Sequence, residues 1–107
     1  MRLLSLMTAL LVVLVVAACA PGPNRLETFA GRNEVATIYN RLRDGRTAEA
    51  WGRCEELYVD GDWGETSMSI DDVQVVSDLC DLVFDDKYDQ ALQRANALLE
   101  AYAESQR

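Results

Sequence analysis

The stretch that decides the fold covers residues 69–102 and reads SIDDVQVVSDLCDLVFDDKYDQALQRANALLEAY. Its apolar residues recur every three or four positions, which is typical of helices with one buried face. The two series are Ile70, Val73, Val76, Leu79, Cys80 and Val83, then Tyr88, Ala91, Leu92, Ala95, Leu98, Leu99 and Tyr102. Ser69 is a favourable N-cap with Asp72 at the third helical position, and Asp85-Asp86 interrupts the pattern. The stretch therefore predicts two helices joined by a tight turn.

The chain before residue 60 predicts a second hairpin of the same kind. Asn24 and Glu27 form a pair like a capping box, so we expect the first helix to start directly after Asn24. Asp44-Gly45 should end it, with Gly45 as a left-handed stop. Its apolar series is Phe29, Val35, Ile38, Tyr39 and Leu42, and that of the next helix is Ala50, Trp51, Cys54, Leu57 and Tyr58. Residues 60–66 predict a loop, and no segment alternates with period two. We expect an all-α fold of four helices in two antiparallel hairpins.

The two hairpins match each other at an offset of 41 residues, the separation of Phe29 from Ile70. The segments DGRTAEAWGRCEELY and DDKYDQALQRANALL resemble the second helix of tetratricopeptide repeats, where small residues at the Ala50 and Ala91 positions allow close helix approach. That resemblance implies two stacked hairpins. It does not extend to the first helix of the family's unit, so a small antiparallel four-helix bundle is the alternative packing.

The N-terminus has the pattern of an export signal. Arg2 is followed by an apolar run over residues 3–16, and the sequence Val16-Ala17-Ala18-Cys19 comes next. These four residues resemble the lipobox of bacterial lipoproteins. The alternatives are an ordinary signal peptide and a membrane span, which needs about 20 apolar residues. Against a span, Pro21-Gly22-Pro23 follows directly, without a basic cluster.

The lipoprotein resemblance divides the chain into three parts. Residues 1–18 would be a cleaved signal peptide, residues 19–25 the lipidated Cys19 with a Pro/Gly-rich tether, and residues 26–107 a helical domain. Cys19 would carry a diacylglycerol and, in many Gram-negative bacteria, an N-acyl chain, which is enough for stable anchoring. No other cofactor is expected. The expected location is the bacterial cell envelope, by default the outer membrane facing the periplasm.

With Cys19 assigned to lipid, Cys54 and Cys80 remain. Disulfides persist in exported proteins, so we expect these two to be bridged, which would add about 3 kcal/mol. Buried free thiols are the alternative. The chain has 10 basic and 18 acidic residues, and its net charge of −8 becomes −9 without Arg2. This charge argues against nucleic acid and would favour a basic protein partner in the envelope; the alternative is that it serves solubility alone.

Nothing in the sequence predicts catalysis. There is no His, and no nucleophile–base pair, phosphate loop or metal-ligand cluster is visible. Asp60, Asp62 and Glu65 suggest a calcium loop, but Glu65 falls where an EF-hand needs Gly, and Asp71 where it needs Glu. Trp63, beside Asp60 and Asp62, is a candidate interaction residue, because Trp is enriched at binding hot spots. The alternative is that Trp51 and Trp63 cover the small core from its edge.

The resulting hypothesis is a lipid-anchored, non-enzymatic helical protein that binds another envelope protein or assists envelope assembly. One alternative is a pilotin for a secretin, by analogy with small helical lipoproteins. Another is an inhibitor of a basic hydrolase such as lysozyme, for which an acidic protruding loop around Asp62 and Trp63 would be expected.

Overall fold

The structure, a computed structural model, describes residues 25–107. They form the helices α2 (Phe29–Arg43), α3 (Thr47–Tyr58), α4 (Ile70–Phe84) and α5 (Tyr88–Ser105), with a short 3-10 helix, η1 (Asp62–Glu65). This part of the chain contains no β-strand, so the all-α prediction is confirmed. Among these residues, no helix has the length and apolar character needed to cross a membrane. The predicted signal peptide and Cys19 lie outside the described residues.

The two hairpins have the same local structure at the expected offset of 41 residues. α2 and α4 begin and end at equivalent positions, and α3 and α5 begin at equivalent positions. Thr28 and Ser69 are the equivalent N-caps, and each side-chain oxygen accepts a hydrogen bond from the backbone N–H three residues later. Each turn passes through a left-handed residue, Gly45 (φ 76°) in one hairpin and Asp86 (φ 60°) in the other. The turn geometry is thus shared although only one turn has the glycine that favours it.

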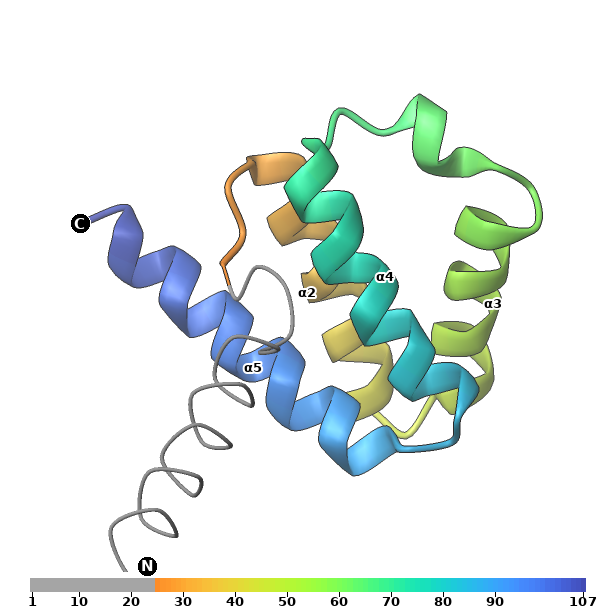
Figure 1. The fold of residues 1–107 in the computed structure, drawn as a ribbon. Coiled ribbons are helices and arrows are strands. Elements are labelled where there is room, and N and C mark those ends of the chain that lie inside the picture. Colours follow the sequence, from red (N-terminus) through yellow and green to blue (C-terminus); the bar gives the residue numbers. More distant parts are fainter. Residues whose placement is uncertain (1–24) are drawn as a thin grey trace, which may run out of the picture.

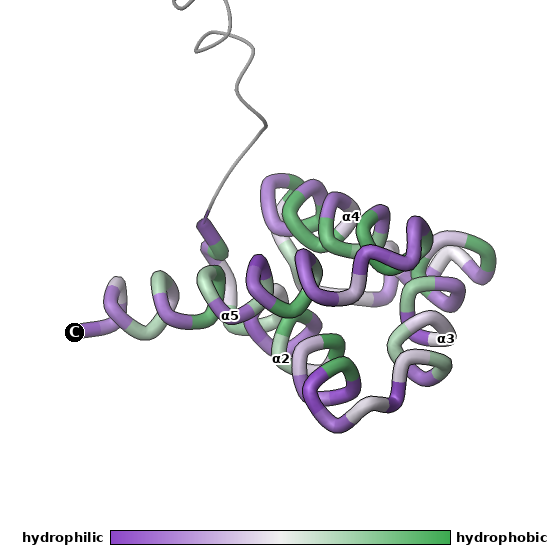
Figure 2. Tube along the Cα trace, turned by 90° about the horizontal axis from the view of Figure 1, so that it is seen from below, coloured by the Kyte–Doolittle hydropathy of each residue, from purple (hydrophilic) through white to green (hydrophobic). Residues whose placement is uncertain are grey.

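The core also follows the repeat. The fully or almost fully buried residues occupy equivalent positions in the two hairpins: Val35 and Val76, Ile38 and Leu79, Leu42 and Val83, Ala50 and Ala91, Cys54 and Ala95, Leu57 and Leu98. Figure 2 shows the resulting pattern, with the hydrophobic stretches of α2 and α4 facing the interior. The helices are therefore amphipathic, and their apolar faces meet in one core.

The hairpins fold on each other and do not form an open stack. α2 packs against α3, α4 and α5, and its contact with α5 is the most extensive in the domain. α4 in turn packs against both α3 and α5. Figure 1 shows α4 in front of α2, with α3 on one side and α5 crossing below. Because the first and last helices touch, the arrangement is a small bundle of two hairpins.

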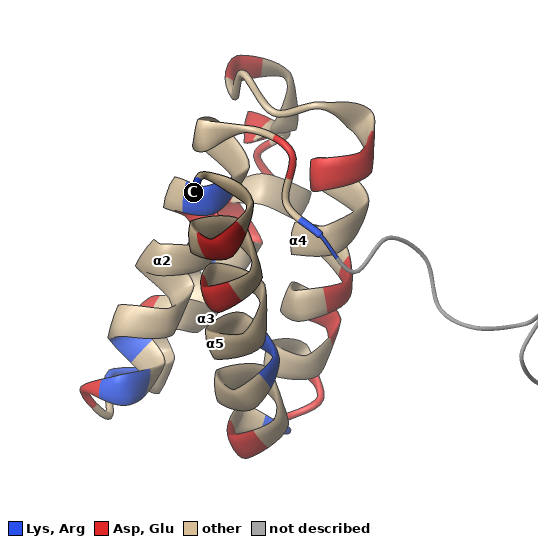
Figure 3. Ribbon diagram, turned by 90° about the vertical axis from the view of Figure 1, so that its left-hand side faces the viewer, with Lys and Arg blue, Asp and Glu red and all other residues tan. Residues whose placement is uncertain are grey.

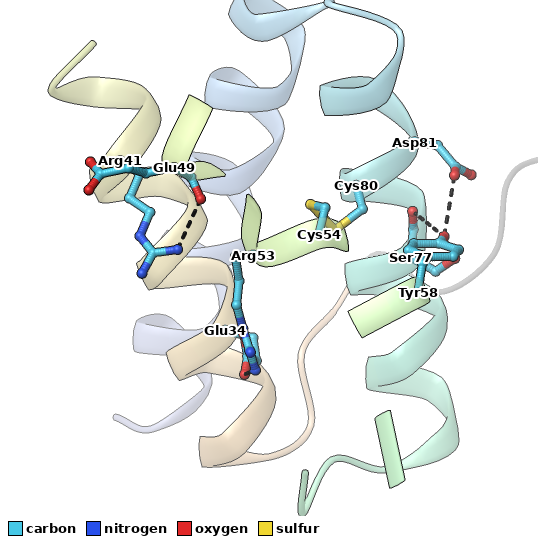
Figure 4. The surroundings of a disulfide bond; sticks show 9 residues. All are labelled: Glu34, Arg41, Glu49, Arg53, Cys54, Tyr58, Ser77, Cys80 and Asp81. Carbon is cyan, nitrogen blue, oxygen red and sulfur yellow. Dashed lines mark hydrogen bonds and ion pairs between the residues drawn. A yellow bond between two sulfur atoms is a disulfide. The ribbon is translucent and has the colours of Figure 1, made fainter. Parts of the chain in front are cut away.

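A disulfide joins Cys54 of α3 to Cys80 of α4, with their Cα atoms 5.5 Å apart, as the sequence predicted. Both cysteines are fully buried. Figure 4 shows the bond lying between the two helices, near Arg53 and Tyr58. The cross-link therefore connects the second helix of one hairpin to the first helix of the other.

Three local predictions were wrong. α2 begins at Phe29 with Thr28 as its cap, so the helix does not start after Asn24. The reason is tertiary, because the backbone N–H groups of Glu27 and Thr28 are bound by a side chain of α4. The predicted loop contains η1, which follows a left-handed Gly61.

The third error concerns the apolar stripes, in which Phe29 and Ile70 were placed. Their side chains are 66% and 89% exposed. Each stands at the first position of its helix, before the helix reaches the core.

Candidate functional site

The unusual features of the domain gather at one end. We call this end, which comprises residues 27–34 and 53–72, the open end. It is opposite the two tight turns, because α3 runs back from its turn along α2 and the chain then passes through η1 to the start of α4 (Figure 1). Figure 1 shows these residues along the upper side of the domain.

A buried carboxylate joins the starts of α2 and α4. Asp72 is fully buried, and its Oδ1 and Oδ2 accept hydrogen bonds from the backbone N–H groups of Glu27 and Thr28, each at 2.8 Å. The hydroxyl of Thr28 donates to the same carboxylate. The contact is reciprocated, because the hydroxyl of Ser69 donates to Glu27 Oε2 at 3.1 Å. The carboxylate thus satisfies donors that precede a helix start, where negative charge is favoured.

Gly31 is the position on α2 that makes room for this carboxylate. A Cβ atom there would lie 2.3 Å from Asp72 Oδ2 and 2.7 Å from its Cγ. Gly31 and Asp72 are equivalent positions in the repeat, at the third residue of each helix. The hairpins therefore differ at this point in a complementary way, with a missing side chain on one helix and a buried carboxylate on the other.

Arg53 of α3 ties three segments together. Its Nε and Nη2 bind both oxygens of Glu34 on α2, at 2.9 and 2.5 Å. Its Nη1 reaches Glu56 at 2.7 Å and Asp62 of η1 at 3.5 Å. The side chains of Arg53 and Glu34 are only 18% and 16% exposed. The hydrogen bond to Glu34 raises the pKa of Arg53 against the opposing effect of burial, so the cation is permanent.

An aromatic row connects α3 to η1 and α4. Trp51 packs edge-on against Phe84 with ring centres 4.6 Å apart, and Phe84 in turn packs against Tyr58 at 5.4 Å. Tyr58 then meets Trp63 at 5.6 Å. The Tyr58 hydroxyl is hydrogen-bonded to Ser77, and it donates to Asp81 at 3.3 Å, as Figure 4 shows. Burial raises the pKa of Tyr58. These contacts hold η1 against the bundle.

A shallow hollow of about 400 Å³ lies beside Arg53, between the first turns of α2, α3 and the η1 segment. Its charged lining residues are Glu34, Asp62 and Glu65 with the single cation Arg53, and its other polar residues are Asn33, Thr66 and Ser67. Glu34 and Asp62 are bound by Arg53, whereas Glu65 is exposed and makes no ion pair. The hollow is therefore polar and net negative.

Exposed apolar side chains stand around the same end. Within residues 25–107 the large apolar residues that are exposed are Phe29 (66%), Val59 (79%), Ile70 (89%) and, less so, Tyr58 (40%). Phe29 and Ile70 begin α2 and α4, and Val59 directly follows α3. All four belong to the open end. Apolar residues exposed together at one end of a small domain are typical of a surface that binds something.

Of the three residues predicted as a possible interaction site, two are half-buried and one is exposed. Trp63 and Asp62 are half-buried, the first against Tyr58 and the second on Arg53, while Asp60 is exposed and unpaired. Cys54 and Cys80 are joined in the core. No group of His, Cys, Asp and Glu among the described residues is arranged to hold a metal ion.

Sequence reasoning missed Asp72, Arg53 and the exposure of Ile70. The only sequence signal for Arg53 was its place at the edge of the apolar stripe of α3. Its three acidic neighbours, on α2, α3 and η1, come together only in the tertiary structure. No local signal marked Asp72, which looks like an ordinary acidic residue in the first turn of a helix. No protein-family model, curated protein or solved structure matches this chain.

Proposed function

We propose that this chain is a lipid-anchored, non-enzymatic module that binds another protein of the bacterial envelope through its open end. The observation that carries the proposal is the gathering of Phe29, Val59 and Ile70, each more than half exposed, at one end of the domain. Scattered apolar residues on a surface need no explanation, but a group of them at one end does.

The framework beneath these residues is well fixed. The Asp72 hydrogen bonds and the Arg53 ion pairs lie at the open end, and the Cys54–Cys80 disulfide joins α3 to α4 further along the bundle. A surface that is already ordered loses little conformational entropy when a partner binds. This supports a role in recognition.

The anchor is part of the proposal and rests on the lipobox resemblance around Cys19. Six residue steps separate Cys19 from Arg25, where the described chain begins, and they can span at most about 20 Å. A lipid on Cys19 would therefore keep the domain close to the membrane surface. The partner would be a membrane protein or a protein held near the same membrane.

The inhibitor alternative called for a protruding acidic loop around Asp62 and Trp63. Both side chains are half-buried and are held by Arg53 and Tyr58 respectively. This geometry gives the inhibitor alternative no support.

Two experiments test the proposal. For the anchor, Cys19→Ser should abolish labelling by radioactive palmitate and release the folded domain from the membrane fraction. A variant that stayed integral in the membrane would refute the lipid anchor. For the interaction, a photo-crosslinking amino acid placed at Ile70 should give one discrete adduct in intact cells. The same amino acid at Asp89, on the opposite end, is the control, and equal adducts at both positions would refute a specific surface.

A further inference from the structure

We infer that the partner surface recognised by the open end is a basic amphipathic segment of a protein, with apolar residues flanked by Lys or Arg. This inference rests on the proposed function and specifies the partner's chemistry. It depends on the combination of exposed apolar side chains with unpaired carboxylates.

Apolar and acidic residues alternate on this surface. Val59 is followed by Asp60, and Ile70 by Asp71, and all four side chains are exposed. Neither Asp60 nor Asp71 makes an ion pair, and the same holds for Glu65 on the rim of the hollow. A partner that covers Val59 and Ile70 therefore also meets carboxylates that have no counter-charge of their own.

The hollow beside Arg53 adds to this negative charge. Glu34, Asp62 and Glu65 outnumber the single guanidinium, which is already bound to three carboxylates. A Lys or Arg side chain of a partner could enter and pair with Glu65. Figure 3 shows acidic residues at the open end as well as on the rest of the domain.

The opposite end has a different character. Arg43 and Arg46 lie at the first tight turn and pair with Asp44, and Arg41 donates to the backbone carbonyl of Glu49 at 3.0 Å. No large apolar side chain is exposed there in the described structure. Within residues 25–107, the opposite end also has carboxylates without an ion pair, Asp85 and Asp89, but no exposed large apolar side chain beside them. Of these two ends, only the open end therefore combines unpaired carboxylates with exposed apolar residues.

Charge decides between the occupants that an apolar surface could have. A second copy of this chain would bring the same unpaired carboxylates against each other, and like charges across an interface oppose association. Anionic lipid headgroups would be repelled in the same way. A basic amphipathic helix complements both the apolar and the acidic part of the surface, and this is a common mode of peptide recognition.

The test uses the full lipidated chain in detergent and three synthetic helical peptides, each about 18 residues long. One alternates Leu and Lys with helical spacing, one has Glu in place of Lys, and one has Ser in place of Leu. Binding is followed by calorimetry at two salt concentrations. We expect the Leu/Lys peptide to bind at least about tenfold more tightly than either control, and more weakly at high salt.

Variants locate the binding surface. Ile70→Asn and Val59→Asn should each lower the affinity for the Leu/Lys peptide by about tenfold, since each removes an apolar side chain that the partner would bury. Asp60→Asn with Asp71→Asn should weaken it and flatten the salt dependence. The matched control is Asp85→Asn with Asp89→Asn at the opposite end, which should leave binding unchanged. Circular dichroism would show that the exposed positions can be changed without unfolding.

Three results would overturn the inference. The first is binding of the Leu/Glu peptide as tight as that of the Leu/Lys peptide. The second is a loss of peptide binding in the Asp85/Asp89 control variant as large as in the Asp60/Asp71 variant. The third is Ile70-dependent binding to phosphatidylglycerol vesicles without binding of the Leu/Lys peptide. The last result would make the open end a membrane-contacting surface. A specific crosslink at Ile70 in cells, together with no preference for the basic peptide, would retain the proposed function and refute only this partner chemistry.

Discussion

Asp72→Asn should destabilise the domain far more than its chemical conservatism suggests. The Asn side chain keeps one oxygen, which can still accept the hydrogen bond that Glu27 N–H donates to Asp72 Oδ1 at 2.8 Å in the wild type. Its NH₂ group then faces the N–H and hydroxyl of Thr28, which at present donate to the second carboxylate oxygen. Two hydrogen bonds to a charged acceptor are lost, and the Thr28 N–H is left buried without a partner. At about 1.5–3 kcal/mol for each such bond, partly recovered by rotation of the hydroxyl, the expected loss is about 3 kcal/mol.

The assay is urea and thermal unfolding of the purified domain, followed by circular dichroism. For a domain of this size about 1 kcal/mol corresponds to a 4–8 °C shift in Tm, so the Tm should fall by about 12–24 °C. Asp71→Asn is the matched control, because Asp71 is adjacent, acidic and exposed, and it should change stability by less than about 0.5 kcal/mol. If the Asp72 variant were as stable as the Asp71 variant, the buried carboxylate would not join the two helices as described.

Three further predictions concern stability. Replacing Cys54 and Cys80 by Ala should cost about 3.5 kcal/mol by the loop-entropy model, since the bridge closes a separation of 26 residues; unfolding in urea measures this, and equal stability of the reduced and oxidised wild type would contradict it. Gly31→Ala should cost about 2–3 kcal/mol through overpacking against the buried carboxylate, whereas Gly52→Ala, where an added Cβ meets nothing within 4 Å inside α3, should gain about 0.5–1 kcal/mol. Burial raises the pKa of Tyr58, so its contribution to stability is complete below about pH 10 and is lost as the pH rises through the higher folded-state pKa. The hydrogen bond to Asp86 also raises the pKa of Tyr88, so absorbance titration at the tyrosinate wavelength should show late titration of two tyrosines. Tyr58→Phe should reduce the amplitude of this late component, and an unchanged late amplitude would refute the assignment.

The helices and their turns could be predicted from the sequence because their causes are local. The recurrence of apolar residues every three or four positions marks α4 and α5, and Ser69 caps α4 as expected. The Asp44-Gly45 and Asp85-Asp86 turns were also predicted correctly. Even the pairing of Cys54 with Cys80 followed from counting cysteines once Cys19 is assigned to lipid.

The candidate site could be predicted only in part. The sequence pointed to the region of Asp60, Asp62 and Trp63, which does lie at the open end. It could not show that Trp63 is packed while Ile70 is exposed, because both are apolar residues near a helix boundary. Which of them faces solvent depends on how α4 lies against α2, and this is not encoded by spacing within either segment.

The sequence by itself determined four amphipathic helices, two equivalent hairpins, an acidic surface and a cysteine pair. Each follows from spacing, composition or chemistry within a few residues, or from a count. Only the tertiary structure decided that the hairpins close into a bundle, that α2 begins at Phe29, and that the exposed apolar residues share one end with unpaired carboxylates. The physical reason is that Asp72 and Glu27 are 45 residues apart, and a hydrogen bond over that separation depends on how whole helices pack.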